Sequence, residues 1–472
     1  MYEYFELMRK YLAFGLLMLT LTSCGSYDNG ELVGVEAKAW NEPKPYGMVL
    51  IKQNSFDLGA DQPDSLFGLN TPSKPVSVSS FWMDETEITN GQYKQFIQWV
   101  CDSIYREKLA DPAFGGNEEY KIFEDENGEP VKPYLNWRIP IPARKHATEE
   151  ELTALNYFLE ADPVLGGFRT KTDRILYQYE WFDHESAAKR AHQLDARKRN
   201  RNTDLAANPE PPVMISKDTA YITESGQVVN TTLTRELSSR FDFLHTRIVA
   251  IYPDTTCWVN DFQNSYNNPY LQNYFSHEAY NAHPVVGVSW EQAVAFCHWR
   301  TQYLNAALSI RGQKVLEYRL PTEAEWEMAA RGGDKDARFP WKGLQTSDKK
   351  GCYFANYKPE KGGYTRDGHE YTAQVASYPA NAYGLFDMAG NVAEWTSTTW
   401  SPSGYEEMEE INPSIHQAIP NNAAYINKRK VVRGGSWKDA ARFIEVSARS
   451  NEYQNESRSY IGFRCVRSQI GN

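Results

Sequence analysis

The stretch Val431–Cys465 constrains the fold of this chain more than any other segment. It begins with two valines, an arginine and the pair Gly434-Gly435, continues with mostly polar residues, and ends on Gly462-Phe463-Arg464-Cys465. Paired glycines permit backbone conformations that other residues adopt only at a cost in free energy. We therefore expect a Gly-Gly turn here, followed by a polar segment that ends with an aromatic ring, an arginine and a thiol.

Length and composition limit the class of protein. The 472 residues are enough for two or three average domains, or for one large irregular unit. Hydrophobic residues make up 41% of the chain, so a substantial core can form. The 30 Tyr and 13 Trp favour an aromatic-rich, loop-rich interior or large contact surfaces. The formal net charge of −11 argues against general nucleic-acid binding, which needs a basic surface.

The N-terminus has the pattern of a secreted lipoprotein. Arg9 and Lys10 precede the apolar run 11–21, which is too short to span a bilayer and is typical of a signal peptide over residues 1–23. The run ends in Leu-Thr-Ser before Cys24, which looks like a bacterial lipobox with an acylated cysteine. Because no Asp follows Cys24, we expect an outer-membrane anchor on the periplasmic face, with residues 24–45 as a lipidated tether. The alternative is an ordinary signal peptide with an incidental cysteine.

Polarity patterns and capping residues predict the main helices and strands. The expected strands are a pair within Tyr46–Gly59, Val76–Met83, a hairpin over Met214–Leu237, and one that begins at Ile248. The expected helices are Thr89–Val100, Trp181–Arg201, Glu291–Leu304 and one that begins after Thr322, which forms a capping-box pattern with Glu325. The basic face of Trp181–Arg201 is either a solvated surface or a contact for an acidic partner.

Several motifs occur in one order along the chain: DETEITN at 84–90, RLPTEAEWE at 319–327, NAYGLFDMAGNVAEWTS at 381–397, and the stretch Val431–Cys465. Together they resemble the formylglycine-generating enzyme (sulfatase-modifying factor) family. The resemblance implies an α+β, C-type-lectin-related fold that is loop-rich, with little regular secondary structure, over residues 46–100 and 283–470. Residues 101–282 resemble nothing in a minimal domain of this family. We expect them to form a large insertion that serves as a partner-binding module.

The resemblance also implies two structural calcium sites. Calcium takes carboxylate, amide and carbonyl oxygens from irregular loops. The first site would use the side chains of Asp387 and Glu394 and the carbonyls of Gly390 and Val392. The second would use the side chains of Asn356 and Asp367 and the carbonyls of Tyr357 and His369. The alternative is that these residues form turns without an ion.

Five cysteines follow the lipobox: Cys101, Cys257, Cys297, Cys352 and Cys465. They allow at most two disulfides and leave one thiol free. No CxxC or Cys/His spacing indicates zinc. The resemblance implies a disulfide between Cys297 and Cys465, and the pairing of the other three stays open.

The resemblance further locates the place of the family's catalytic centre. The enzymes bind copper through two cysteines between their RGGSY and AARS motifs, because soft thiolates suit cuprous copper. The corresponding interval, Lys438–Ser447, contains no Cys, with Asp439 near the first position and Ala441 or Phe443 near the second. We therefore expect no formylglycine synthesis and no copper.

Two histidines raise the question of a second enzyme class. Some members of the superfamily use a histidine triad on iron, and His184 and His192 are eight residues apart on the predicted basic helix. Two histidines in a polar helix are more often surface residues than metal ligands, so we expect no metal there.

Segments of the insertion point to a narrower resemblance. MISKDTAY at 214–221 and YPDTTCWVNDF at 252–262 are similar to the GldK/PorK type of lipoprotein in gliding motility and type IX secretion of Bacteroidetes. This resemblance implies a non-catalytic subunit of a large homo-oligomeric periplasmic ring that binds a GldN/PorN-type protein and other secretion components. The alternatives are a periplasmic ligand-binding lipoprotein with a pocket near Asp439–Glu445, or an enzyme of the superfamily.

Overall fold

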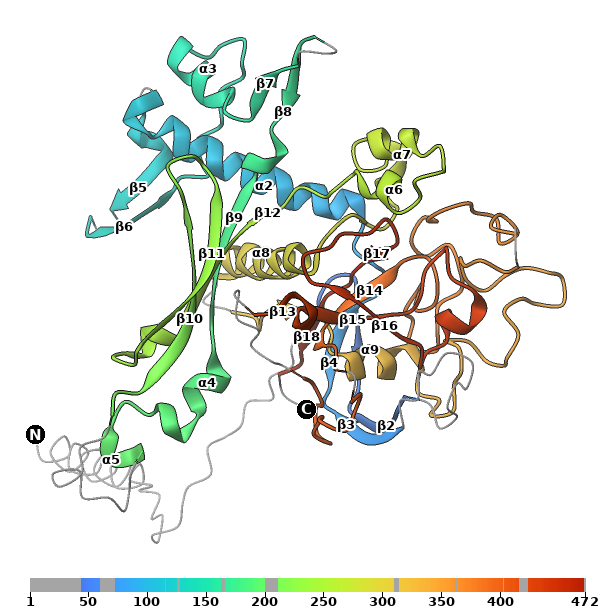
Figure 1. Ribbon diagram of the computed structural model, residues 1–472. Coiled ribbons are helices and arrows are strands. Elements are labelled where there is room, and N and C mark those ends of the chain that lie inside the picture. The colour runs from blue at the N-terminus through green and yellow to red at the C-terminus, as the bar shows by residue number, and fades with distance from the viewer. Residues whose placement is uncertain are drawn as a thin grey trace, which may run out of the picture. The chain divides into compact units, whose positions relative to one another are not determined.

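The computed structural model describes residues 44–59, 73–114, 116–124, 128–162, 166–199, 211–309, 314–360, 363–401, 403–415 and 423–470. The predicted signal peptide, Cys24 and all but the end of the tether lie outside these residues. Lys44–Ile470 forms one compact unit, in which short strands and helices are joined by long irregular segments (Figure 1). This mixture confirms the α+β class. None of the described helices is long and apolar enough to cross a membrane.

One four-stranded sheet joins the two ends of the described chain. Its order is β1 (Met48–Ile51), β4 (Phe81–Asp84), β18 (Val466–Ser468) and β13 (Tyr318–Arg319), and all neighbours are antiparallel. A separate hairpin pairs β2 (Asn54–Leu58) with β3 (Lys74–Val78). The two strands predicted within Tyr46–Gly59 exist, but their predicted pairing with each other is wrong, and Val76–Met83 is divided between β3 and β4. Alternating polarity predicts a strand but does not predict which strand pairs with it, and here the paired strands come from distant segments.

A second four-stranded sheet contains the Gly-Gly segment. Its order is β16 (Arg449–Tyr453), β15 (Arg429–Arg433), β14 (Ala393–Thr399) and β17 (Ile461–Gly462). Gly434 and Gly435 follow β15 with φ angles of 90° and 63°, a region that side chains disfavour. A Cβ atom on Gly435 would lie 2.5 Å from the carbonyl oxygen of Phe443. The predicted turn is confirmed, and close packing adds a second reason for glycine at 435.

Three helices begin where the sequence predicts and contribute buried residues to the core. α2 (Asn90–Leu109) begins at Thr89, as predicted, but continues past the predicted end at Val100. α8 (Trp290–Ser309) covers the predicted helix Glu291–Leu304. α9 (Glu323–Ala330) has the predicted capping box of Thr322 with Glu325. These helix starts were predictable because a cap is a local pattern of hydrogen bonds.

Residues 101–282, the predicted insertion, contain small antiparallel sheets. They pair β5 (Lys121–Glu124) with β6 (Pro130–Leu135), β7 (Leu159–Ala161) with β8 (Phe168–Thr170), β9 (Leu176–Phe182) with β12 (Leu244–Ala250), and β10 (Met214–Ile222) with β11 (Val228–Glu236). Short helices are α3 (Glu149–Leu155), α6 (Cys257–Asn260) and α7 (Asn268–Asn273). The hairpin predicted over Met214–Leu237 is confirmed, and the strand predicted to begin at Ile248 exists but begins earlier, at Leu244.

The single helix predicted over Trp181–Arg201 is wrong. Its first residues end β9, and the rest forms α4 (His184–Ala188), a 3-10 turn (Arg190–His192) and α5 (Ala196–Arg199). Neither α4 nor α5 buries a residue. A composition of Ala, Lys and Arg favours a helix only weakly, and most helices of a folded protein are stabilised by packing of an apolar face. This segment has no such face.

Strands β9 and β12 belong to the same core as α2 and α8. The ring of Tyr177 on β9 packs edge-on against Phe96 on α2, with 5.2 Å between centroids. The hydroxyl of Tyr93 on α2 donates a hydrogen bond of 2.9 Å to the carbonyl of Ile251, just after β12. The boundaries of the insertion stay predictions, but removal of all of residues 101–282 would open this shared core.

Candidate functional site

The interval Lys438–Ser447 forms a compact turn after β15. The carboxylate of Asp439 accepts hydrogen bonds from the backbone NH and the hydroxyl of Ser436, at 3.0 and 2.7 Å. The same carboxylate pairs with Lys438 Nζ at 2.7 Å. A 3-10 turn (Ala441–Ile444) follows and buries Ile444. Asp439 therefore uses its oxygens to close the turn, at the place where the family resemblance puts the first copper-binding cysteine.

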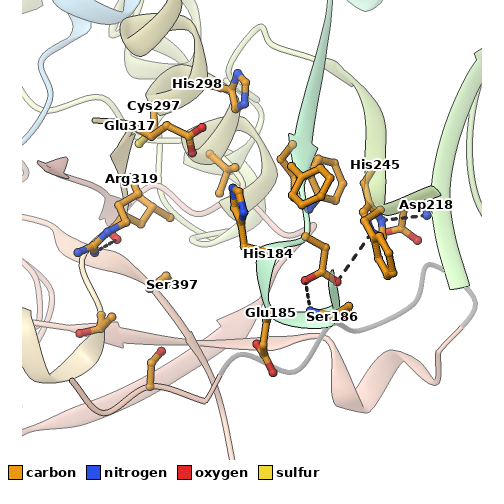
Figure 2. Close-up of a pocket in the computed structure, with 18 of the residues that line it drawn as sticks. His184, Glu185, Ser186, Asp218, His245, Cys297, His298, Glu317, Arg319 and Ser397 are labelled. Carbon is orange, nitrogen blue, oxygen red and sulfur yellow. Dashed lines mark hydrogen bonds and ion pairs between the residues drawn. The ribbon is translucent and has the colours of Figure 1, made fainter. Parts of the chain in front are cut away.

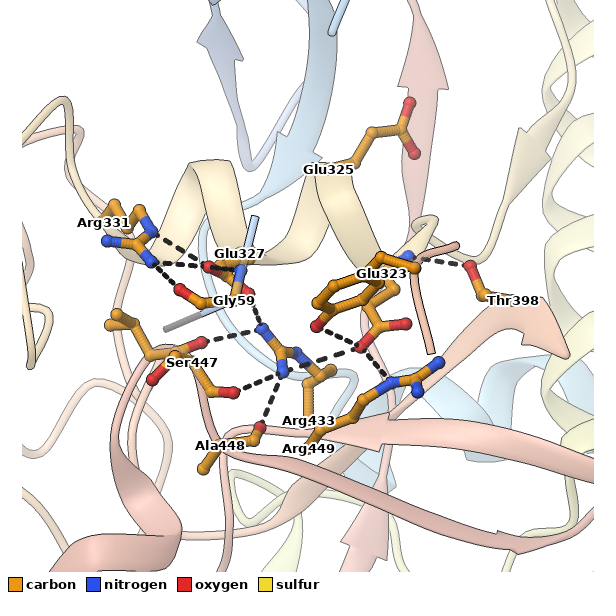
Figure 3. A network of polar contacts seen from close by, with 12 residues as sticks. Gly59, Glu323, Glu325, Glu327, Arg331, Thr398, Arg433, Ser447, Ala448 and Arg449 are labelled. Carbon is orange, nitrogen blue, oxygen red and sulfur yellow. Dashed lines mark hydrogen bonds and ion pairs between the residues drawn. The ribbon is translucent and has the colours of Figure 1, made fainter. Parts of the chain in front are cut away.

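Five buried charges connect this segment to α9 (Figure 3). We call them the α9 network: Glu323, Glu327, Arg331, Arg433 and Arg449. Arg433 donates to Glu327 and to backbone carbonyls of residues 446–448. Arg331 donates to Glu327 at 2.7 Å, and Arg449 donates to Glu323 at 2.7 Å. Both carboxylates thus face guanidinium groups, which fixes the segment after β15 against the helix.

The first predicted calcium loop gathers more negative than positive charge. Glu394 accepts hydrogen bonds of 2.6 and 2.8 Å from the guanidinium of Arg464, and Asp387 accepts one of 2.7 Å from the backbone NH of Ala376. Burial and the nearby charge of Asp387 raise the pKa of Glu87, and burial raises the pKa of Asp387 to about 6. Glu87 Oε2 accepts no hydrogen bond from an N–H or hydroxyl donor in the described part of the chain, and the Glu87 side chain lies within hydrogen-bonding reach of Asp387. Three carboxylates and one guanidinium suit an added cation.

The predicted carbonyl ligands lie on the same loop. Gly390 has a φ angle of 78°, and a Cβ atom there would lie 2.2 Å from the carbonyl oxygen of Asn356. Val392 is fully buried. Glycine is therefore required at 390, and the loop backbone is held close to the second predicted calcium set. The calcium itself stays a prediction.

The second predicted set is also brought together. The Asp367 carboxylate accepts hydrogen bonds from the backbone NH groups of Tyr357 and His369, at 2.8 and 3.3 Å. Burial raises the pKa of Asp367. Asn356 donates to the carbonyl of Tyr371 at 2.8 Å, while its buried Oδ1 has no partner among the described residues. An orphaned amide oxygen near a half-buried carboxylate fits a hard cation.

Side chains alone do not complete a metal site. In the described ranges, no three His, Cys, Asp or Glu side chains form a group that could hold a metal ion. Both calcium sites would therefore depend on the predicted backbone carbonyls.

Cys297 on α8 and Cys465 before β18 meet in the core, with 3.5 Å between their Sγ atoms. Both are buried, free thiols. The structure brings the predicted partners together, and the disulfide itself stays a prediction. Cys101, Cys257 and Cys352 are also free thiols.

A cleft of about 1370 Å³ lies between strands and a helix of residues 101–282, the predicted insertion, and elements outside that range (Figure 2). Residues of β9, β10, β12 and α4 line one wall, and residues of α8, β13, β14 and β15 line the other. His184 and His192 both line the cleft, but they lie on α4 and on the following 3-10 turn, because the predicted helix is broken. His245 and His298 also line it. No local motif marks these two, which come from a strand and a helix far apart in the chain.

Most polar groups of the cleft wall are used within the wall. His245 Nδ1 accepts a hydrogen bond of 3.0 Å from the backbone NH of Asp218, and its ring stacks on Trp181. Burial lowers the pKa of His245. Arg247 pairs with Glu291 at 2.9 Å and with Asp218 at 3.7 Å. These groups build the wall and do not form a nucleophile–base pair of the kind used in covalent catalysis.

Comparison with known proteins gives a family match over nearly the whole chain. The family described as "Sulfatase-modifying factor enzyme 1-like domain" matches residues 35–469. The formylglycine-generating enzyme of Mus musculus is 34% identical over 194 residues, which cover 40% of this chain and 45% of that protein. The formylglycine-generating enzyme of Streptomyces coelicolor is 36% identical over 188 residues, 39% of this chain and 52% of that protein. The chain thus spans about half the length of these relatives.

Other matches have different names. The "Inactive C-alpha-formylglycine-generating enzyme 2" of Mus musculus is 32% identical over 191 residues, 39% of this chain and 49% of that protein. Among solved structures, PvdO from Pseudomonas aeruginosa superposes with a TM-score of 0.40 at 17% identity, covering 89% of this chain and 94% of that chain.

Proposed function

The chain belongs to the sulfatase-modifying factor enzyme 1-like family, and we propose that it is a non-catalytic member with a structural role. In this proposal it is an outer-membrane lipoprotein, anchored through Cys24, and a subunit of the periplasmic ring of the type IX secretion and gliding motility machinery. The C-type-lectin-related core carries the insertion, which binds a GldN/PorN-type protein. Support comes from the GldK/PorK-like segments of the insertion and from the missing thiols.

The turn at Asp439 carries the non-catalytic part of the proposal. The resemblance assigns copper binding to two thiolates, and no Cys lies between Cys352 and Cys465. Carboxylate and aromatic side chains are poor substitutes for thiolates toward cuprous copper. The Asp439 carboxylate is also already used by Ser436 and Lys438. One relative of similar identity is itself named inactive, so similarity at this level does not decide activity.

The structural role is supported by the contrast between a braced core and exposed apolar residues on the insertion. Phe168 on β8, Tyr221 on β10 and Leu233 on β11 expose more than half of their side-chain surface. Two-stranded sheets also leave backbone groups at their edges that can pair with another chain. Calcium at the two predicted sites would brace the core without taking part in chemistry.

A copper and activity assay tests the non-catalytic role. The purified protein, exposed to cuprous copper and a cysteine-containing sulfatase peptide, should hold no stoichiometric copper and leave the peptide unoxidised. The Streptomyces coelicolor formylglycine-generating enzyme serves as the positive control. Stoichiometric copper together with an aldehyde product on the peptide would overturn the proposal.

A recovery assay tests the structural role. The double variant Tyr221→Ser, Leu233→Ser should lower recovery of the GldN/PorN-type protein in co-purification from membranes, because both side chains are exposed on the hairpin β10–β11. Leu344→Ser is the matched control, since Leu344 is exposed outside the insertion. Cys24→Ala should move the protein from the membrane fraction to the soluble fraction. If the wild type recovers no GldN/PorN-type protein, the ring assignment fails.

The cleft of Figure 2 favours a second candidate, a ligand-binding lipoprotein. Its volume exceeds that of most small-molecule pockets. This candidate is compatible with a structural role, because the cleft and the exposed hairpin residues are different parts of the molecule.

A further inference from the structure

Lys430 on β15 is a buried cation in the wall of the cleft. Only 5% of its surface is exposed. Its Nζ donates one hydrogen bond, of 3.0 Å, to the hydroxyl of Thr399, and it lies 4.4 Å from the ring centroid of Trp290. Among the described residues, no carboxylate oxygen lies within 4.0 Å of Lys430 Nζ, the largest distance at which an ion pair is counted. An ammonium has three N–H donors, so Lys430 lacks both a counter-ion and part of its hydrogen bonding.

Glu291 attracts the charge on Lys430 and compensates it only in part, because Glu291 lies beyond ion-pair distance from Lys430 and is already paired with Arg247. Glu291 accepts from Arg247 at 2.9 Å and from Gln454 at 3.1 Å. Arg247 also repels the charge on Lys430. Burial and this repulsion lower the pKa of Lys430 to about 8. At pH 7 the group is therefore still mostly protonated, although its surroundings oppose the charge.

The other lysine and arginine side chains that line the cleft each have a carboxylate partner. Lys189 pairs with Glu185 at 3.9 Å, and Arg319 pairs with Glu325 at 2.6 Å. Arg247 has two partners, as described above. Along the described cleft lining, Lys430 is thus the single Lys or Arg side chain without an ion-pair partner, so a negative group of a ligand is favoured at Lys430 itself and not beside the acidic lining residues Asp183 and Glu317. A phosphate group, which favours several cations or a bidentate arginine, matches a single lysine poorly.

An unpaired buried charge costs several kcal/mol, so a fold keeps one mainly where it serves binding. We propose that the cleft binds an extended peptide segment, and that Lys430 receives a carboxylate of that peptide through its two remaining N–H groups. The size of the cleft fits several residues rather than a small acid. Its walls combine aromatic rings, such as Trp181 and Trp290, with hydrogen-bonding groups such as Ser397 and Gln454, the mixture that peptide recognition uses.

The carboxylate comes either from the C-terminus of the peptide or from an Asp or Glu side chain. The test distinguishes these sources with three mixtures of random hexapeptides, passed over the immobilised mature protein and quantified by mass spectrometry. One mixture has free C-termini and no acidic residues, one is amidated and has no acidic residues, and one is amidated with Glu at the fourth position. We expect about tenfold higher retention of one or both carboxylate mixtures over the neutral mixture, the effect of a charge-assisted hydrogen bond.

Variants connect this preference to the site. Lys430→Gln and Lys430→Met should abolish it, while Lys438→Gln, which removes a lysine paired with Asp439 outside the cleft lining, should leave it intact. Thermal melts of each variant verify folding, and two different replacements guard against a local distortion by either one. Equal retention of all three mixtures, no retention of any mixture, or a preference that survives both Lys430 variants would overturn the proposal.

Discussion

Buried charges are paired in the α9 network, whereas the cleft contains a buried charge without an ion-pair partner among the described residues. In the network, Glu323 and Glu327 each meet a guanidinium, and Arg433 also satisfies three backbone carbonyls (Figure 3). In the cleft, Lys430 is equally buried and meets only a hydroxyl and an aromatic ring. Buried pairs specify one arrangement of the chain, whereas an unpaired buried charge is a cost that a ligand can remove. The comparison separates residues that position the fold from a residue available for binding.

The first predicted calcium loop is an intermediate case. Glu87, Asp387 and Glu394 share the single guanidinium of Arg464, so the loop is partly compensated. One divalent cation would balance it. The α9 network pairs every one of its five charged side chains, the predicted calcium loop shares one guanidinium among three carboxylates, and Lys430 has no ion-pair partner within the described residues.

The largest expected effect is in the α9 network. Arg433→Met should destabilise the protein by about 3–5 kcal/mol, because it leaves Glu327 short of one cation and three carbonyls without a donor. Urea unfolding followed by tryptophan fluorescence measures this change. A loss below about 1 kcal/mol would show that the buried ion pairs of the network contribute little to stability, which would contradict the comparison with the cleft.

Lys430→Met should change stability in the opposite direction. The pKa of Lys430 is about 8, against an ordinary value of 10.5. This difference corresponds to a gain of at most about 3 kcal/mol in the free energy of unfolding of the variant at pH 7. Between pH 8 and 10.5 the unfolded chain binds the proton more tightly than the folded one, so wild-type stability rises with pH in that window. The advantage of the variant should therefore be full below pH 8 and shrink toward pH 10.5. Unfolding curves at pH 7, 9 and 10.5 measure it, and a variant less stable than wild type at pH 7 would contradict the uncompensated charge.

Removal of calcium should have the next largest effect. A cation at 100 times its Kd stabilises the folded state by about 2.7 kcal/mol, so a chelator should lower the melting temperature of the wild type. Asp387→Asn together with Asp367→Asn should reduce this difference, since both carboxylates are predicted ligands. A melt that is the same with calcium and with chelator would argue that the loops fold without an ion.

The smallest effect is expected at a solvent-exposed pair. Arg338 and Glu445 approach to 2.6 Å, but Arg338 is about half exposed. Exposed ion pairs contribute about 0–1 kcal/mol, so Arg338→Met should barely move the urea midpoint. It is the matched control for Arg433→Met, because both remove a guanidinium bound to a glutamate. A loss as large as that of Arg433→Met would mean that burial is not what separates the two pairs.

Local sequence patterns determined much of the scaffold. The caps at Thr89 and Thr322, the turn at Gly434-Gly435 and the family motifs were readable because each depends on neighbours within a few residues. The missing thiols of Lys438–Ser447 were also readable, because an absent residue type needs no structure to be noticed.

Tertiary structure decided what depends on distant partners. β1 pairs with β4 and not with β2, and the basic segment after Trp181 breaks because no apolar face holds it as one helix. Glu87 joins the predicted calcium loop from a position 300 residues before Asp387. Lys430 looks like an ordinary strand lysine in the sequence, and only the packing of β14, β15 and α8 buries it beside Trp290 without a counter-ion. Burial and pairing are set by contacts across the fold, so no local pattern encodes them.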